Sequence, residues 1–181
     1  MHISASTPTL DDATDSKALR TAFGAFATGV TVVTTGGAVP HAMTANSFTS
    51  VSLSPPLLLV CVAKSAMMHR RLAESSFFGV SVLAGHQEAA ARHFADRYRA
   101  LGAAQFAQVD VELGELTRVP LIADAAVSFE CDLWRAYDGG DHTIFLGKVL
   151  SMRQRPGSDG LLVYRGRFAE IDAASSEGVT A

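Results

Sequence analysis

The chain is poor in charge, and no part of it is strongly basic. Only 18% of its 181 residues are charged, and the formal net charge is -3 at pH 7. Nucleic-acid binding needs a basic stripe that faces the phosphates, and the pair Arg70 and Arg71 is too short to form one. The composition therefore argues against nucleic acid as a partner.

Long apolar runs are also missing. The longest one, residues 57–63, is far too short to cross a bilayer. The N-terminal segment MHISASTPTLDDATDSK has neither the basic nor the apolar region of a signal peptide. We therefore expect a cytoplasmic protein without a membrane partner.

Cysteine is scarce, and the motifs of several enzyme classes do not occur. Cys61 and Cys131 lie in expected strands without CxxC spacing, so we expect two buried free thiols in a reducing compartment. The six histidines form no HxH or HExxH pair, which argues against a metal site. The sequence has no GxSxG for a nucleophilic serine, and neither GxGxxG nor GxxxxGK(S/T) for phosphate. A nicotinamide nucleotide would thus have to bind without a dedicated dinucleotide domain.

What is present instead is a series of β-rich segments. Residues 30–35 are β-branched throughout and precede a double glycine, and residues 127–133 alternate between apolar and polar with a period of two. We expect strands at residues 30–35, 57–63, 77–83, 127–133, 142–152 and 161–165, with residues 57–63 in the centre of the sheet. Helical spacing or composition predicts helices over residues 19–26, with Asp15 or Ser16 as N-cap, and over residues 67–75 and 86–97.

Six or seven strands in hairpins, together with short helices, indicate a mainly β protein with an antiparallel barrel and not a doubly wound sheet. We expect one domain over residues 16–171, with disordered tails at residues 1–15 and 172–181. Residues 97–126 are poorly patterned, and their structure is left open.

The segment TANSFTSVSLSPP, residues 44–56, is unusually polar for a segment that leads into a buried strand. Six of the eleven residues from Thr44 to Ser54 carry hydroxyl groups, and Asn46 adds an amide. Buried polar groups need partners, and a flat ligand with polar edges would supply them. Alternatively, the segment is an edge strand whose hydroxyls bond to the local backbone.

Two further places favour a ligand. Residues 63–66 lead from a strand into a helix, where the first amide groups favour an anion such as a phosphate. Ser65 is either a phosphate ligand or the helix N-cap, and Lys64 either adds charge to the site or is solvated. His142 follows a glycine-rich turn, from which its side chain would project over the mouth of the barrel. Otherwise it is an exposed residue of a plain hairpin.

Several segments resemble one known family, in order and at similar spacing. They are GVTVVTT (29–35), AMTANSFTSVSLSPPLLLVCV (42–62), FFGVSVL (77–83), ARHFA (91–95) and GGDHTIFLGKV (139–149). Together they resemble the flavin reductase-like domain, the FMN-binding split barrel found as the reductase component of two-component flavin-dependent monooxygenases. The similarity is greatest to reductases of natural-product pathways, including enediyne and polyketide antibiotic biosynthesis.

The resemblance implies a Greek-key split-barrel homodimer that reduces free flavin by hydride transfer from NADH. The flavin would be FAD, with FMN as the alternative, and the reduced flavin would reach a partner monooxygenase by diffusion. NADH is favoured over NADPH because the sequence shows no obvious arginine pair for a 2′-phosphate.

The resemblance also implies which residues form the site. The isoalloxazine ring would be lined by Gly29, Val30, Thr31, Val32, Val33, Thr44, Ala45, Asn46 and Ser47. The ribityl-phosphate side would be held by Ser50, Val51, Ser52, Leu53, Ala63, Lys64, Ser65 and Ala66. The nicotinamide would be faced by His142, as the catalytic residue that orients it, and by Tyr164, Arg167 and Phe168.

Two other interpretations remain. One is a pyridoxamine phosphate oxidase-like FMN oxidase, which the sparse lysines and arginines disfavour. The other is a non-enzymatic barrel that binds flavin or another small ligand. The GGDHTI turn is the one feature of the sequence that argues against it.

Overall fold

The computed structural model describes residues 12–172. The tails expected at residues 1–11 and 173–181 lie outside this range. Residues 12–15, also expected in a tail, instead form a turn in which the amide of Thr14 donates to Asp12. The carboxylate of Asp15 then accepts from the Lys17 amide and caps helix α1 (Ser16–Phe23), one of the two caps expected.

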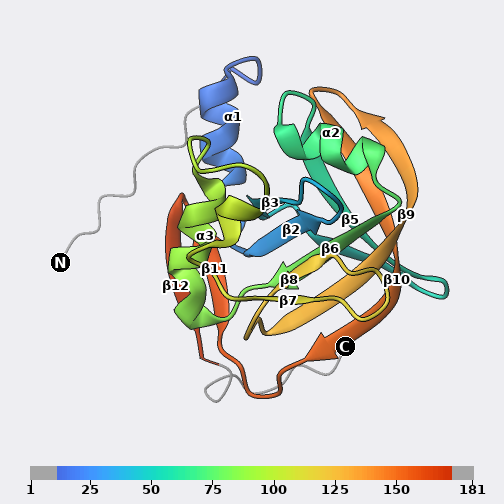
Figure 1. Ribbon diagram of the computed structural model, residues 1–181. Helices are drawn as coiled ribbons and strands as arrows, with labels where there is room; N and C mark the ends of the chain where they lie inside the picture. The colour runs from blue at the N-terminus through green and yellow to red at the C-terminus, as the bar shows by residue number, and fades with distance from the viewer. Residues whose placement is uncertain (1–11, 173–181) are drawn as a thin grey trace.

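One seven-stranded antiparallel sheet forms most of the molecule (Figure 1). Its spatial order is β3-β2-β6-β9-β10-β5-β4. The strands are β2 (Thr31–Thr35), β3 (His41–Ala45), β4 (Thr49–Leu53), β5 (Pro56–Ala63), β6 (Phe77–Val82), β9 (Val127–Gly139) and β10 (His142–Gln154). All of its pairings are antiparallel, which confirms the expected mainly β fold.

Two smaller sheets and a few short helices complete the fold. The small sheets are β1 (Thr28–Gly29) with β11 (Gly160–Tyr164) and β12 (Arg167–Ile171), and β7 (Val111–Leu113) with β8 (Pro120–Ile122). The helices after α1 are α2 (Met67–Glu74), η1 (Gly85–Gln87), α3 (Glu88–Ala95) and η2 (Gly102–Phe106). Within residues 12–172, no helix is long and apolar enough to cross a membrane.

The main sheet curls so that its two ends approach each other. The hydroxyl of Ser47, just after edge strand β3, accepts from the amide of Cys61 at 3.0 Å and donates to its carbonyl at 2.9 Å. Cys61 lies in β5, next to the opposite edge. One serine side chain therefore satisfies two backbone groups of β5 and joins the two ends of the sheet.

Apolar side chains fill the space inside this curl. One cluster joins the strands to α2 through residues including Val60, Phe78, Phe145, Met68 and Leu72. A second cluster places α3 against β2 and β3, because Ala91 and Phe94 of the helix pack on Val32 and Ala42. Helices α2 and α3 therefore both contact β3, and they lie on either side of a space above this strand.

The structure corrects several expectations. Strand β5 is not central, because the hairpin with β4 leaves it one strand from the edge. Helix α1 ends at Phe23 and not at residue 26, and both Phe23 and Phe26 are largely exposed. Cys131 is buried as expected, but Cys61 is only half-buried, and both thiols are free.

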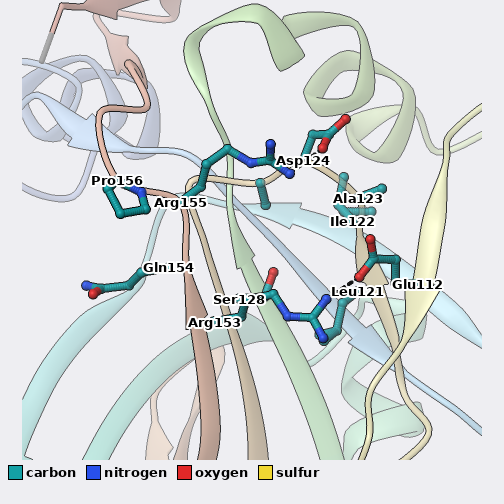
Figure 2. A pocket seen from close by; sticks show the side chains of 11 residues that line it. Glu112, Leu121, Ile122, Ala123, Asp124, Ser128, Arg153, Gln154, Arg155 and Pro156 are labelled. Carbon is teal, nitrogen blue, oxygen red and sulfur yellow. Dashed lines mark hydrogen bonds and ion pairs between the residues drawn. The ribbon is translucent and has the colours of Figure 1, made fainter.

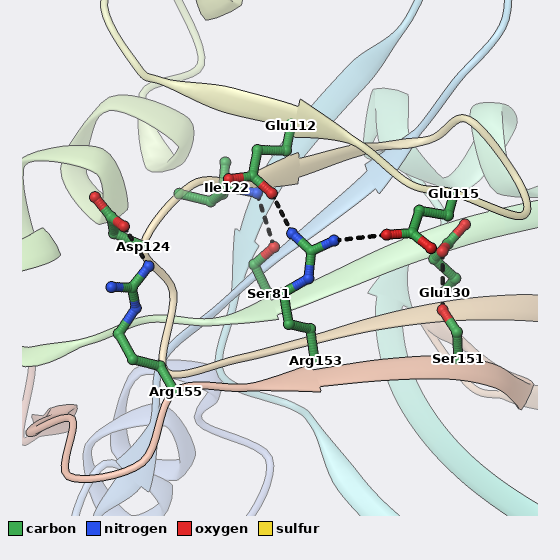
Figure 3. A network of polar contacts seen from close by, with 9 residues as sticks. All are labelled: Ser81, Glu112, Glu115, Ile122, Asp124, Glu130, Ser151, Arg153 and Arg155. Atoms are coloured by element: carbon green, nitrogen blue, oxygen red, sulfur yellow. Dashed lines mark hydrogen bonds and ion pairs between the residues drawn. The ribbon is translucent and has the colours of Figure 1, made fainter.

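The segment that the sequence left open is held by a buried carboxylate. Glu130 of β9 accepts hydrogen bonds from the amides of Leu116 and Thr117 and from the Thr117 hydroxyl. It also accepts one from the Ser151 hydroxyl (Figure 3). Arg153 pairs with Glu112 and Glu115 beside it. These non-local bonds, and not a local repeat, fix residues 111–122 on the sheet.

Candidate functional site

A cavity of about 670 Å³ lies between α2 and α3, over β3 and the end of β5. This size falls in the range of small-molecule sites. The expected site residues that line it are Thr44, Ala45, Asn46, Ser47, Ala63, Ser65, Ala66 and His142. Further lining residues that the sequence did not indicate include His41, Met43, Cys61, Phe94, Arg97 and Arg99.

The end of β3 forms the floor of this cavity. The Thr44 hydroxyl donates to the carbonyl of Ala91 at 2.7 Å, and the Ser47 hydroxyl is used by Cys61. These hydroxyls therefore bond to backbone, as in the alternative interpretation of the polar segment. The amide side chain of Asn46 has no hydrogen-bond partner among residues 12–172, and it lines the cavity. Asn46 is thus left to bind a ligand.

Residues 63–66 form the entry to α2. The N-cap of this helix is Ala66, which offers no side-chain bond, so the expectation of Ser65 as N-cap is wrong. The Ser65 side chain is exposed to the cavity and has no protein partner in the described chain. Lys64 is neither free nor in the cavity lining, because its Nζ pairs with Asp138 at 2.9 Å. A hydroxyl beside an uncapped helix N-terminus suits a phosphate group.

Strand pairing brings His142 to the same place. His142 is the first residue of β10 and pairs with Ala63 of β5, so the turn after β9 lies beside the entry to α2. Its Nδ1 lies 2.6 Å from a carboxylate oxygen of Asp141. This hydrogen bond lowers the pKa of Asp141, which is therefore an acceptor for the Nδ1–H group. This tautomer leaves the ring lone pair at Nε2, and His142 lines the cavity.

The cavity is also lined by His41 and two arginines, Arg97 and Arg99. Burial, followed by the charges of Arg99 and Arg71, lowers the pKa of His41 to about 4, so this imidazole is neutral at pH 7. Arg99 bonds to the carbonyls of Ala42 and Asp96 and lies 3.4 Å from His41 Nε2. The only signal in the sequence was the pair of arginines two residues apart directly after α3.

Several residues implied by the family resemblance do not line this cavity. The side chains of Val30, Thr31, Val32 and Val33 are buried, because β2 is covered on both faces by the two clusters and paired on both edges. Gly29 is exposed outside it. Edge strand β4 carries Ser50, Val51, Ser52 and Leu53 away from the cavity.

The C-terminal residues are also placed elsewhere. Tyr164, Arg167 and Phe168 belong to the β11–β12 hairpin, which pairs with β1 and not with the strands of the cavity. Phe168 packs on the second cluster and lies under the guanidinium of Arg92 at 4.9 Å. Within one chain, these three side chains do not meet His142.

A smaller hollow of about 220 Å³ lies near the end of β10 (Figure 2). Its charged groups neutralise one another, because Arg153 pairs with Glu112 and Arg155 pairs with Asp124. It offers no unpaired charge for a ligand, so the cavity of about 670 Å³ between α2 and α3 is the candidate site.

Residues 23–172 match the model of the flavin reductase like domain. The chain belongs to this family.

Individual members are similar over nearly the whole chain. An NADH-dependent FAD reductase of Streptomyces globisporus is 54% identical over 169 residues, which are 93% of each chain. The structure of the Streptomyces globisporus C-1027 NADH:FAD oxidoreductase SgcE6 with NAD and FAD fragments has a TM-score of 0.87 at 52% identity. It matches 93% of this chain and all of that one. BorF, the flavin reductase component of a bacterial two-component tryptophan halogenase, has a TM-score of 0.84 at 51% identity over 87% of this chain and 99% of its own.

The cavity of this flavin reductase-like chain fits a flavin nucleotide. It is lined by the unpartnered groups of Asn46 and Ser65 and by apolar side chains such as Met43 and Phe94. No aspartate or glutamate lines it, so no negatively charged side chain of the lining would repel a phosphate.

Proposed function

We propose that the protein is an NADH-dependent flavin reductase that reduces free FAD, with FMN as a second substrate. The observation that carries this proposal is the convergence of Asn46, Ser65 and His142 on one cavity, although they lie on three separate segments. The relatives named as NADH-dependent FAD reductases support the choice of both nucleotides.

Each lining group has a distinct task. The uncapped start of α2 and the Ser65 hydroxyl would hold the flavin phosphate. Asn46 would bond to the polar edge of the ring, and Met43 and Phe94 would provide apolar contact. When bound, the flavin accepts a hydride from the nicotinamide of NADH.

His142 would orient the nicotinamide. Since Asp141 fixes the Nδ1–H tautomer, Nε2 accepts a hydrogen bond, and the carboxamide N–H of a nicotinamide is a suitable donor. A hydride transfer needs no protein base, so positioning is the contribution of this side chain. The turn between the paired strands β9 and β10 holds the imidazole in place, so His142 can orient the nicotinamide without a second domain.

We further propose a homodimer that hands reduced flavin to a monooxygenase by diffusion. Val51 and Leu53 of edge strand β4, and Trp134 and Met152 of the β9–β10 hairpin, are exposed apolar side chains that a second copy would cover. Two further relatives, 39% and 33% identical to this chain, are reductase components of flavin-dependent monooxygenases, which supports such a partner. An enzyme that consumes NADH would work where NADH is made, in the cytoplasm.

The deciding experiment is NADH oxidation by the purified protein with and without added flavin. Turnover that depends on free FAD is the expected result. Flavin binding without NADH oxidation would support the non-enzymatic binder instead, and oxidation of pyridoxamine phosphate would support the FMN oxidase. Sedimentation at micromolar concentration tests the dimer, and a monomer there would contradict it.

A further inference from the structure

The end of the cavity at α3 carries positive charge that the assigned flavin and nicotinamide contacts do not use. Arg97 and Arg99 both line it, in the segment that follows α3. Arg97 is exposed and makes no hydrogen bond or ion pair with residues 12–172. The Nε–H of Arg99 is buried without a partner.

The two guanidinium groups are held in different ways. Arg99 is anchored, because it donates to the carbonyls of Ala42 and Asp96 and lies over the Phe94 ring at 6.0 Å. The loop itself is fixed by Gln105, which is fully buried and bonds to the amide of Ala42 and the carbonyl of Pro40. Arg97 also lines the cavity but has no protein partner among residues 12–172.

The surroundings compensate this charge only in part. His41 beside Arg99 is neutral, and no carboxylate lines the cavity. The Asp96 carboxylate lies outside the lining and accepts from the Tyr98 amide, and its charge acts on Arg99 without forming an ion pair with it. A charged arginine pair that lines the same nucleotide-sized cavity as Ser65, at the entry to α2, suits a second phosphate group.

We propose that Arg97 and Arg99 form a second phosphate subsite, which binds the pyrophosphate of a dinucleotide. The inference rests on the proposed function, because that function puts FAD and NADH at this cavity. It adds that the protein recognises the dinucleotide form of a substrate through the segment after α3. A mononucleotide has a single phosphate and no pyrophosphate, so it would not use the subsite.

The test compares each dinucleotide with its mononucleotide half in the variant Arg97→Ala. Dissociation constants for FAD and FMN are measured by quenching of flavin fluorescence, and kcat/KM is measured with NADH and with reduced nicotinamide mononucleotide. If the pyrophosphate belongs to FAD, the Kd for FAD rises about tenfold, as for one exposed charge-assisted hydrogen bond, and the Kd for FMN does not change. If it belongs to NADH, kcat/KM falls by a similar factor with NADH and stays constant with the mononucleotide. Either result supports the subsite and names its ligand.

Two more variants make the result specific. Arg97→Lys keeps the charge but not the fork of donors, so it should lose part of the effect. Arg70→Ala removes an exposed arginine of α2 that does not line the cavity and should leave all four constants unchanged.

Three outcomes would overturn the proposal. They are unchanged constants for both dinucleotides in Arg97→Ala, equal losses for dinucleotides and mononucleotides, and an effect on NADPH alone, which would assign the arginines to a 2′-phosphate. Because the flavin titrations need no turnover, they test the subsite even if the wild-type protein fails to oxidise NADH. That failure would refute the proposed function separately.

Discussion

Replacement of His142 by alanine is the sharpest test of the nicotinamide position. The side chain is 43% exposed and would offer one neutral hydrogen bond, from a carboxamide to Nε2. Such a bond contributes about 1 kcal/mol net, which corresponds to a loss of roughly fivefold in kcat/KM for NADH. The FAD affinity should stay constant, because the flavin phosphate is assigned to Ser65 and the start of α2. Stopped-flow reduction of bound FAD by NADH, with a separate FAD titration, measures both quantities.

Two related variants distinguish orientation from a general disturbance. Asp141→Ala removes the acceptor that fixes the tautomer, so it should slow flavin reduction in the same direction but less than His142→Ala. His142→Gln keeps a hydrogen-bonding group and should recover part of the rate. A wild-type rate in His142→Ala would remove this residue from the mechanism. An equal loss of FAD affinity would show that it contacts the flavin instead.

Three further predictions concern the phosphate position and the stability of the fold. Ser65→Asp should weaken FAD binding about tenfold or more, because the new carboxylate repels the phosphate. Ser65→Ala should have a smaller effect. An unchanged FAD titration in both variants would place the phosphate elsewhere. Burial raises the pKa of Glu130, but hydrogen bonds from Thr117, Ser151 and Leu116 outweigh it, so the pKa is lowered from 4.5. The ionised carboxylate stabilises the fold fully above pH 4.5, and this stabilisation is lost as the pH falls through the lower pKa of the folded state. At pH values below about 4.5, the Tm of the wild type should therefore fall more steeply than the Tm of Glu130→Gln. Parallel curves of Tm against pH would contradict this. Gly147→Ala would put a Cβ 2.5 Å from the Phe78 ring, which should lower the free energy of unfolding by about 2 kcal/mol in urea titrations, whereas Gly29→Ala, with open space around its Cβ, should not.

The local chemistry of the sequence determined most of the secondary structure. β-Branched runs, period-two alternation and double glycines act within a few residues, so β2, β6, β9 and the β9–β10 turn lie where these patterns predict them. Helix α2 and the connection from β5 into it, residues 63–66, also lie where the local sequence predicts them. The segment 97–126 has no such pattern, because its position depends on single buried groups such as Glu130 and Gln105 that bond to distant backbone.

Only the tertiary structure decided which side chains the site contains. Strand alternation predicts that half of β2 faces outward, but packing on both of its faces buries Val30 to Val33 and removes them from the cavity. Ser47 is polar enough to bind a ligand, yet the curl of the sheet brings Cys61 to it and uses its hydroxyl. Arg99 reaches the carbonyl of Ala42, 57 residues earlier, because α3 packs on β3. Local patterns specify strands and turns, whereas the partners that each polar group finds depend on contacts between segments far apart in the chain.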